Sequence, residues 1–321
     1  MDFSKIRHGL KEITFIRSLK DAEIYFQKTA FLLPRIFGFQ YRHTPVPASL
    51  QLEPTNCCNI RCICCPTARS SRKRGFMEFG LFQRIIDDAS AIGVRRIHLY
   101  MHGEPMLHPK IVEMIRFIKS KGLFFNLVTN GMPFDDEKIK GILEAGVDLG
   151  DHIVFSVLGH SKNVHEKVMA GIDHDRVYGN ISSLIELRRR RKRFTPIVEI
   201  VFYAMPENER EQIGLVNAWS GKVDHVRIIS KISESFRGYK RSNLQEPAVK
   251  GRCPNIWERM GIFWNGDVTV CCEDVDGDYI LGNLAQRTIR EIWNHPELLA
   301  LKRMHRRKEF HRHPLCSVCD M

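Results

Sequence analysis

This sequence predicts an α/β protein built on a parallel sheet, curled or open, with a smaller second unit toward its C-terminus. Two observations support that prediction. Stretches with β character alternate with amphipathic helical stretches through most of the chain, which is typical of right-handed βαβ units. The ten cysteines also gather at two places, between residues 57 and 65 and from residue 253 onward, which predicts two separate metal sites.

Composition and the N-terminal stretch indicate a globular protein of a reducing compartment. Of the 321 residues, 43% are apolar and 27% charged, and the formal net charge is +12. The stretch MDFSKIRHGLKEITFIRSLKD interrupts its apolar residues with Lys and Arg, so it is no signal peptide, and we expect a cytoplasmic protein. Clustered cysteines in such a compartment are expected to bind metal rather than to form disulfides.

Six stretches with strand character account for the predicted sheet. They cover residues 48–54, 95–101, 124–131, 152–159, 196–205 and 225–232. Helical patterns lie between them, and three of these patterns, over residues 79–93, 109–122 and 136–146, end at a glycine. Parallel sheets place their chemistry at the carboxyl ends of the strands. The cysteine cluster and the stretches HGEP, TNG and SVLG all fall there, so we expect them to meet at one site.

The stretch EPTNCCNIRCICCP contains Cys58, Cys62 and Cys65 in the spacing Cys-x3-Cys-x2-Cys. It resembles the cluster-binding loop of the radical S-adenosylmethionine (radical SAM) enzymes. The resemblance implies that three thiolates hold a [4Fe–4S] cluster whose fourth iron is open to the amino and carboxylate groups of S-adenosylmethionine (AdoMet). Zinc is the weaker alternative, because a structural zinc site takes four protein ligands. Cys57 and Cys64 are interpreted as packing residues, although the family places an aromatic side chain at the position of Cys64.

Three further stretches match family positions that bind AdoMet. Gly103, Glu104 and Pro105 resemble the family's Gly-Gly-Glu-Pro motif, in which backbone polar groups hold the ammonium group of AdoMet. His102 stands in place of the first glycine of that motif. Asn130, within the TNG stretch, and Ser156 match positions that line the ribose and the carboxylate.

Charged residues near the site are candidates for two further roles. The family often has an arginine at the position of Met169, so Lys167 or a later arginine is expected to pair with the AdoMet carboxylate. No general base stands out. Glu199, Lys231 and Arg237, on or after the fifth and sixth strands, are the candidates.

The C-terminal part predicts a second unit. Apolar alternation around Asn265-Gly266 indicates a two-residue hairpin, and the stretch from Thr288 to Glu309 has helical spacing. The pattern resembles the twitch domain, the shortened form of the SPASM domain that follows many radical SAM barrels. The resemblance implies one fully ligated auxiliary [4Fe–4S] cluster, with a zinc ribbon as the alternative. Its ligands would be Cys253, Cys271, Cys316 and Cys319. Cys272 is expected to point away from this site, because adjacent strand residues face opposite sides of a sheet.

These motifs divide the chain into three predicted parts. Residues 1–47 form a basic helical extension, residues 48–235 the radical SAM core, and residues 236–321 the auxiliary-cluster domain. For the core the resemblance implies a partial (βα)6 TIM-like barrel, and for the C-terminal part a small α+β iron–sulfur domain. The extension is expected either to dock on the barrel or to make peripheral contact with an anionic membrane surface.

From about residue 50 to the end, the chain is similar to the twitch-containing alcohol dehydrogenases of aminoglycoside biosynthesis. The resemblance implies an oxidoreductase that cleaves AdoMet reductively to a 5′-deoxyadenosyl radical and abstracts a substrate hydrogen atom. An alcohol, sugar or lipid-linked substrate is then oxidised through the auxiliary cluster. The alternative is a peptide maturase that crosslinks or epimerises residues of a ribosomal peptide. A third interpretation, a zinc protein that binds nucleic acid, is disfavoured by the Gly-Glu-Pro stretch at a strand end.

The positive net charge favours an anionic partner, such as an anionic small-molecule, sugar-linked or lipid-linked substrate. The basic run Arg188–Arg193 is interpreted as a solvated helix end, where cations favour the helix dipole. No nucleic-acid-binding motif accompanies this run. The implied redox chemistry requires an electron donor such as flavodoxin or ferredoxin.

Overall fold

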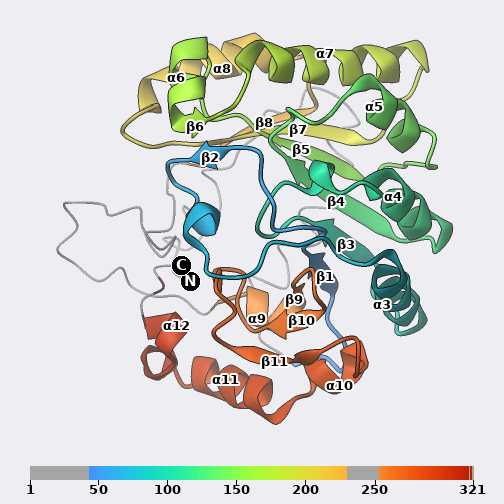
Figure 1. Cartoon of the computed structure of the whole chain (residues 1–321), viewed down its shortest axis with the longest axis vertical. Coiled ribbons are helices and arrows are strands. Elements are labelled where there is room, and N and C mark those ends of the chain that lie inside the picture. The colour runs from blue at the N-terminus through green and yellow to red at the C-terminus, as the bar shows by residue number, and fades with distance from the viewer. Residues whose placement is uncertain (1–42, 230–252, 318, 320–321) are drawn as a thin grey trace, which may run out of the picture. The chain divides into compact units, whose positions relative to one another are not determined.

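Figure 1 shows the fold in a computed structural model, which describes residues 43–229, 253–317 and 319. The strands are β1 (Ser49–Leu52), β2 (Arg61–Cys62), β3 (Arg96–Leu99), β4 (Phe124–Thr129), β5 (His152–Ser156), β6 (Met169–Ala170), β7 (Ile197–Tyr203), β8 (His225–Ile229), β9 (Arg259–Ile262), β10 (Asp267–Thr269) and β11 (Ile280–Asn283). The helices are α3 (Phe79–Ala91), α4 (Ile111–Ser120), α5 (Asp136–Leu143), α6 (Lys162–Val168), α7 (His174–Arg190), α8 (Gln212–Trp219), α9 (Asn255–Glu258), α10 (Ile289–Trp293), α11 (Pro296–Arg306) and α12 (Pro314–Ser317).

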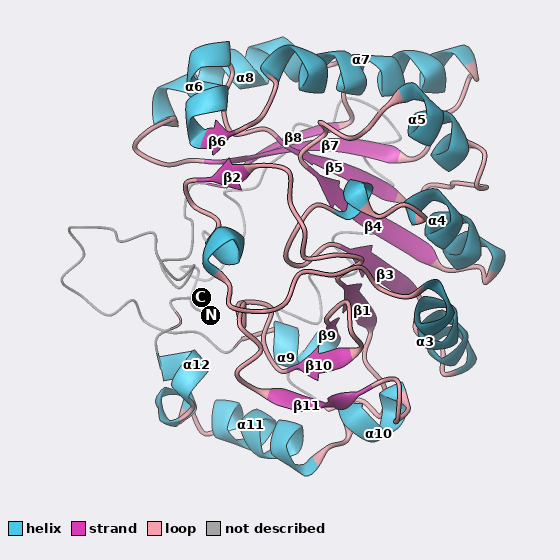
Figure 2. Ribbon diagram, in the orientation of Figure 1, coloured by secondary structure: helices cyan, strands magenta, loops and turns pink. Residues whose placement is uncertain are grey.

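A nine-stranded sheet runs through the described residues in the order β11-β10-β9-β1-β3-β4-β5-β7-β8. Strands β1, β3, β4, β5, β7 and β8 pair in parallel, and they are the six strands expected from the sequence. Helices α3, α4, α5 and α7 lie along one face of these strands (Figure 2). The predicted fold class, a partial (βα)6 barrel with a small C-terminal α+β part, is confirmed.

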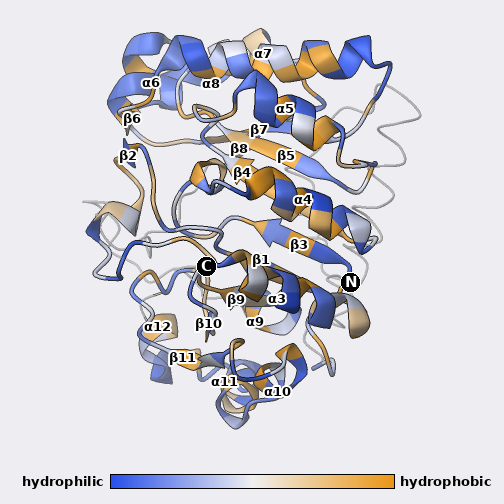
Figure 3. Cartoon of the chain, turned by 45° about the vertical axis from the view of Figure 1, so that its right-hand side comes forward, coloured by the Kyte–Doolittle hydropathy of each residue, from blue (hydrophilic) through white to orange (hydrophobic). Residues whose placement is uncertain are grey.

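The hydrophobic core lies between the helices and the parallel strands. Alternate strand residues, among them Leu50, Ile97 and Phe125, are fully buried on the helix side. Figure 3 shows hydrophobic residues along β5 and β7, whereas much of α7 is hydrophilic. Because strand residues alternate between faces, the residues between these core positions point to the opposite side, which we call the inner face of the sheet.

The predicted glycine stops are confirmed. The chain leaves α3, α4 and α5 through Gly93, Gly122 and Gly146, which have φ values of +86°, +68° and +81°. Further on, the predicted helical stretch from Thr288 to Glu309 proves to be two helices, α10 and α11. Pro296 occupies the first turn of α11, where its missing N–H costs nothing, and a proline cannot continue the preceding helix.

The predicted hairpin at Asn265-Gly266 is present, but the predicted turn length of two residues was wrong. The backbone N–H of Phe263 donates to the carbonyl of Asp267 over 2.8 Å. The turn between this pair therefore has three residues, Trp264–Gly266, and Gly266 has a φ of +90°. A glycine is favoured at the last position of such a turn because it adopts the left-handed conformation without steric cost.

The C-terminal hairpin extends the barrel sheet rather than forming a sheet of its own. Strand β9 pairs in parallel with β1, with Ser49 opposite Arg259, and β10 then pairs antiparallel with β9. The predicted domain boundary at residue 235 lies in the stretch between β8 and α9, outside the described residues.

Residues that lead into β1 contact the C-terminal helices. The indole of Trp293 donates to the carbonyl of Thr44 over 2.8 Å, and His43 contacts the side chain of Asn294 at 2.9 Å. Apart from these last few residues, the predicted extension over residues 1–47 lies outside the described residues, so its docking and membrane roles stay predictions. Of the helices that the structure describes, none has the length and apolar character needed to cross a membrane.

The basic run at the end of α7 is largely paired within the chain. Arg188 is buried and bonds Asp224, Arg189 and Arg190 pair with Glu186, and Arg191 pairs with Glu144. The exposed pairs of Arg189, Arg190 and Arg191 contribute little to stability, typically about 0–1 kcal/mol each. These contacts satisfy much of the run's charge locally, so binding of an anionic partner there stays a prediction.

Candidate functional site

The loops that follow β1 and β3 are in direct contact at the carboxyl edge of the sheet, as predicted. The backbone N–H of Glu104 donates to the carbonyl of Cys57 over 2.8 Å. Beside it, Gly103 has a φ of +96° and lies so close to the cysteine loop that a Cβ would come within 2.4 Å of the carbonyl oxygen of Thr55. Only glycine fits this approach without displacing the loop.

The Glu104 carboxylate joins the HGEP loop to the loop after β4. It accepts hydrogen bonds from the Thr129 hydroxyl (2.7 Å), the Asn130 backbone N–H (2.7 Å) and the Met106 backbone N–H (3.0 Å). Glu104 is only 2% exposed, and burial raises its pKa to about 7 although the three donors favour the ionised form. The Glu104 side chain therefore joins the loops that follow β3 and β4.

Asn130 and Ser156 occupy the next two strand ends. The Asn130 amide donates to the side chain of Asn59 over 2.9 Å, so it connects the TNG turn with the cysteine loop. Ser156 is the last residue of β5, is half-buried, and forms no side-chain hydrogen bond to the described residues. Their predicted contact with AdoMet stays a prediction.

The three cysteines of the first site share one loop. Cys62 lies in β2, where it is opposite Met169 of β6, and the N–H of Cys65 donates to the carbonyl of Cys62 over 3.1 Å. Burial raises the pKa of the Cys62 thiol, and its neighbours Cys58, Cys64 and Cys65 raise it further. Within the described ranges no three side chains form a ready-made metal centre. Three crowded thiols nevertheless suit an iron–sulfur cluster, whose iron neutralises the charge of the thiolates.

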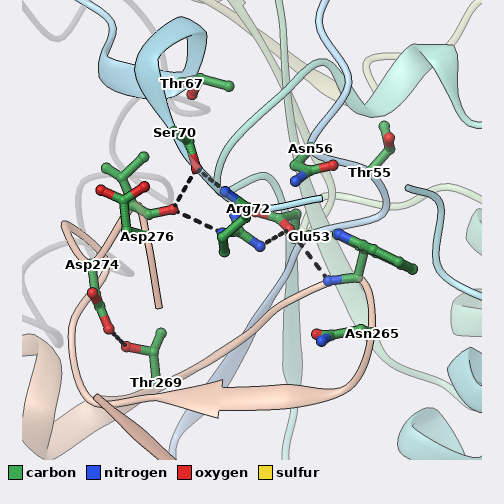
Figure 4. Close-up of polar contacts among 12 residues, drawn as sticks. Glu53, Thr55, Asn56, Thr67, Ser70, Arg72, Asn265, Thr269, Asp274 and Asp276 are labelled. Carbon is green, nitrogen blue, oxygen red and sulfur yellow. Dashed lines mark hydrogen bonds and ion pairs between the residues drawn. The ribbon is translucent and has the colours of Figure 1, made fainter. Parts of the chain in front are cut away.

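A strap formed by residues 66–77 follows the cysteine loop and contacts the C-terminal part (Figure 4). The guanidinium of Arg72 makes two hydrogen bonds to the buried Glu53 carboxylate, over 2.9 and 2.7 Å, and a third to the carbonyl of Val275 over 2.8 Å. It also lies 3.8 Å from the centre of the Phe263 ring. The Glu53 carboxylate accepts another bond from the backbone N–H of Trp264. This one pair thereby connects β1, the strap and the C-terminal hairpin.

Asn56 holds the strap from the cysteine loop. Its amide donates to the carbonyl of Lys73 and accepts from the N–H of Gly75, both over 2.9 Å. At the other end of the strap, the Ser71 backbone N–H donates to Asp276 over 2.8 Å. The strap is therefore bonded both to the first cysteine site and to the loop that carries Cys271.

Sequence reasoning missed these linking residues. Glu53 directly follows a strand and precedes Pro54, so an acid at a strand end was the available signal. Nothing near Arg72 in the sequence pointed to Glu53 as its partner, because several basic residues surround it.

The second group of cysteines surrounds one pocket. It is lined by Cys253, Cys271, Cys316 and Cys319, by His305, and by the apolar side chains of Ile256, Val270, Leu301, Phe310 and Leu315. The four predicted ligands thus come together from three separate segments. Four thiols around an apolar pocket suit a fully ligated cluster, since a nonpolar shell limits access of water to the cluster.

Cys272 does not line this pocket, but the reason predicted for this was wrong. Cys271 and Cys272 lie beyond the end of β10 at Thr269, so strand alternation does not apply to them. The thiol of Cys272 instead accepts a bond from the Asn255 amide over 3.3 Å. The loop is ordered by Asp274, which accepts from the Thr269 hydroxyl over 2.9 Å (Figure 4).

The charged candidates are scattered. Glu199 lies on the inner face and pairs with Arg227 at 2.5 Å. Lys167 is exposed on α6, and Met169 is buried beside Cys62. Lys231 and Arg237 lie outside the described residues. The roles predicted for Glu199, Lys167, Lys231 and Arg237, as a general base or as the partner of the AdoMet carboxylate, stay predictions.

Two sequence families match the chain. Residues 52–215 match the radical SAM superfamily, and residues 253–320 match SPASM, an iron–sulfur cluster-binding domain. The chain is 26% identical over 291 residues to the tungsten-containing aldehyde ferredoxin oxidoreductase cofactor-modifying protein of Pyrococcus furiosus, covering 76% of this chain and 80% of that protein. It is 26% identical over 313 residues to PqqA peptide cyclase of a Methylobacterium species, covering 86% of this chain and 79% of that protein.

Several solved structures share the fold, among them those of SuiB and BtrN. Streptococcus suis SuiB bound to precursor peptide SuiA has a TM-score of 0.66 at 15% identity, covering 99% of this chain and 82% of that chain. BtrN in complex with AdoMet and 2-DOIA has a TM-score of 0.60 at 17% identity, covering 87% of this chain and 95% of that chain. At these identities the likeness concerns the fold alone.

The matched families carry two [4Fe–4S] clusters and AdoMet as their cofactors, which replaces the zinc alternatives at both sites. The first match covers about half of the chain and includes the cysteine loop, the HGEP stretch and the ends of β4 and β5. With this match, and with those loops together at the carboxyl edge of a partial barrel, the chain belongs to the radical SAM superfamily.

Proposed function

We propose that this radical SAM enzyme modifies a peptide. The observation that carries the proposal is the similarity to PqqA peptide cyclase, which extends over 86% of the chain. The likeness to SuiB, whose structure contains a precursor peptide, supports it from the side of the fold. Peptide maturation was the alternative in the sequence analysis, and it now has better support than the oxidation of an alcohol, sugar or lipid-linked substrate.

In this proposal the cysteine loop and the C-terminal pocket each hold one cluster. The ligands are Cys58, Cys62 and Cys65 for the first cluster and Cys253, Cys271, Cys316 and Cys319 for the second. When bound, the first cluster and AdoMet supply the abstraction of a hydrogen atom from the substrate. Main-chain groups of Gly103–Pro105 bind the AdoMet ammonium, and Glu104 keeps them in position. Asn130 and Ser156 face its ribose and carboxylate.

The experiment uses anaerobically reconstituted full-length protein with AdoMet, a chemical reductant and short peptides encoded beside its gene. We expect formation of 5′-deoxyadenosine together with a peptide that has lost two hydrogens, as after crosslinking, or that takes up deuterium from heavy water, as after epimerisation. Mass spectrometry measures both. The Cys58/Cys62/Cys65→Ala triple variant is the control and should change no peptide. A wild type that leaves these peptides unchanged while oxidising an alcohol would overturn the proposal.

That outcome would favour the second candidate, oxidation of a small alcohol through the auxiliary cluster. The likeness to BtrN, which covers 95% of that chain, is the observation in its favour. A substrate deuterated at the reacting carbon separates the candidates, because deuterium in 5′-deoxyadenosine identifies which molecule lost its hydrogen. The electron donor, flavodoxin or ferredoxin, stays a prediction in either case.

His305 is expected to tune the second cluster. Its Nε2 lies 3.4 Å from the Sγ of Cys316, and the side chain is 2% exposed. A hydrogen bond to a cluster thiolate stabilises the more negative, reduced state, so His305→Leu should lower the reduction potential. The potential is measured by an EPR-monitored redox titration in the Cys58/Cys62/Cys65→Ala background, where only the second cluster reports.

The exposed His311 provides the matched control, since His311→Leu should leave the potential unchanged. The reduction potential of His305→Gln, which retains an N–H donor, should lie between those of His305→Leu and His311→Leu. An unchanged potential in His305→Leu would contradict the hydrogen bond. A loss of iron in that variant would mean that His305 is itself a ligand.

A further inference from the structure

The inner face of the barrel carries a row of polar side chains. Gln51, His98, Asn126 and His152 lie opposite one another on β1, β3, β4 and β5. Their strand neighbours on the other face belong to the hydrophobic core, so the row points into the concave side of the sheet. Ser156, a predicted AdoMet contact, projects from the same face, four positions beyond His152 along β5, which is about 13 Å in the strand direction.

Several buried polar atoms of this face have no hydrogen-bond partner. They are the Nδ1 of His98, the Oδ1 of Asn126 and the Nε of Arg259. Leaving such an atom unpaired in a folded protein costs about 1–3 kcal/mol. Three of them in one region therefore call for a specific explanation, such as a ligand that supplies the missing partners.

Arg259 is the charged member of the group. It begins β9, which is paired with β1, and its guanidinium contacts the Gln51 side-chain oxygen at 3.4 Å and the Tyr100 hydroxyl at 3.2 Å. Both partners are neutral oxygens, and among the described ion pairs there is none for Arg259. Its charge is therefore available to an anion.

The group also lies between the two cofactor sites. Tyr100 is two residues before His102 in the loop that leads to Gly103 and Glu104, and the ring of His98 is 5.5 Å from the ring of Tyr100. On the other side, Arg259 directly follows α9, whose Ile256 lines the pocket of the second cysteine group. A group bound by Arg259 is thereby placed near both loops.

We propose that Arg259, Tyr100, His98 and Asn126 bind an anionic oxygen group of the substrate, a carboxylate or a phosphate, together with an adjacent N–H or O–H donor. The anionic oxygens accept from Arg259 and the Tyr100 hydroxyl, and the donor satisfies the Asn126 oxygen. For a peptide substrate this group is an acidic or phosphorylated side chain. The inference rests on the proposed function for its substrate class and on the geometry alone for the anion.

The test measures thermal unfolding of the reconstituted full-length protein with three probes: succinate, inorganic phosphate and the neutral succinamide. We expect succinate or phosphate to raise the Tm and succinamide to leave it unchanged, because ligands that bind the native state stabilise it. A response to succinate alone indicates a carboxylate, and a response to phosphate alone a phosphoryl group. If neither anion raises the Tm, the unpaired atoms are satisfied by water and the proposal is overturned.

Single substitutions test whether the anion binds at Arg259. In Arg259→Gln the apparent Kd of the effective anion should weaken about tenfold or more, which corresponds to the loss of a charge-assisted bond. The matched control is Arg95→Gln, which removes the same charge from an exposed position beside β3 and should bind like wild type. Equal binding in both variants would overturn the proposal.

A second measurement does not depend on added anion. His98→Leu and Asn126→Leu each remove a buried polar atom that has no hydrogen-bond partner, so the anion-free protein should unfold at the same or a higher temperature. A lower Tm in both would show that these groups serve the fold and would contradict a ligand role. If peptides are modified but no anion binds, only the anion site is wrong. If anions bind but no peptide is modified, the peptide assignment is wrong.

Discussion

Replacing Cys58, Cys62 and Cys65 together with alanine is expected to halve the iron content, from about eight to about four per chain. The two sets of cysteines lie on different segments, the first on the loop after β1 and the second around the C-terminal pocket, so loss of one cluster should leave the other. Formation of 5′-deoxyadenosine should fall to background in the same variant. Iron and sulfide assays after anaerobic reconstitution, with EPR of the reduced protein, provide the measurement.

The other two cysteines of the loop provide the control. Cys57→Ala and Cys64→Ala should keep about eight irons, because neither belongs to the Cys-x3-Cys-x2-Cys set. A wild type with only about four irons, falling to none in the triple variant, would contradict a cluster in the C-terminal pocket.

Removing Arg72 is expected to destabilise the folded protein strongly. The Glu53 carboxylate is completely buried, with a side-chain exposure of 0%, and Arg72 is its charged partner at 2.7 Å. Arg72→Ala leaves that carboxylate without its charge partner, which typically costs about 3–5 kcal/mol. The free energy of unfolding is measured by denaturant titration, with Arg303→Ala on the exposed side of α11 as the control.

The pH dependence of this variant identifies the cause. Burial raises the pKa of Glu53, and Arg72 opposes that rise. Without Arg72 the folded pKa moves further above the unfolded one, so the folded state favours the protonated acid. The stability that this preference for the protonated acid contributes is present below the unfolded pKa of Glu53. It is lost as the pH rises through the folded pKa. The difference from wild type should therefore be smallest in acid and largest at neutral and alkaline pH. A difference that is independent of pH would indicate lost packing instead.

The candidate site was predictable to the extent that its parts are contiguous motifs. Cys58, Cys62 and Cys65 lie within eight positions, and the HGEP stretch follows a recognisable strand. Their meeting at one edge followed from the rule that parallel strands align their carboxyl ends. The role of the Glu104 side chain did not follow, since its partners Thr129 and Asn130 lie 25 and 26 residues away.

Two predictions for the C-terminal part were wrong for different reasons. The hairpin signal at Asn265-Gly266 was recognised, but the length of the turn depends on the pairing of Phe263 with Asp267. The break at Pro296 was hidden by apolar spacing that continues across it, because periodicity reports a buried face and not the continuity of a helix.

By itself, the sequence determined the alternation of strands and helices, the ligand spacing of the first site and the grouping of the cysteines, because each is a local pattern of period or spacing. Only the tertiary structure decided that β9 extends the barrel sheet, that Glu53 pairs with Arg72 and that Arg259 reaches Gln51. The last two contacts join residues 19 and 208 positions apart. Many glutamates, arginines and glutamines are equivalent to these in the sequence. Burial and strand pairing select among them, and both arise only when the chain is folded.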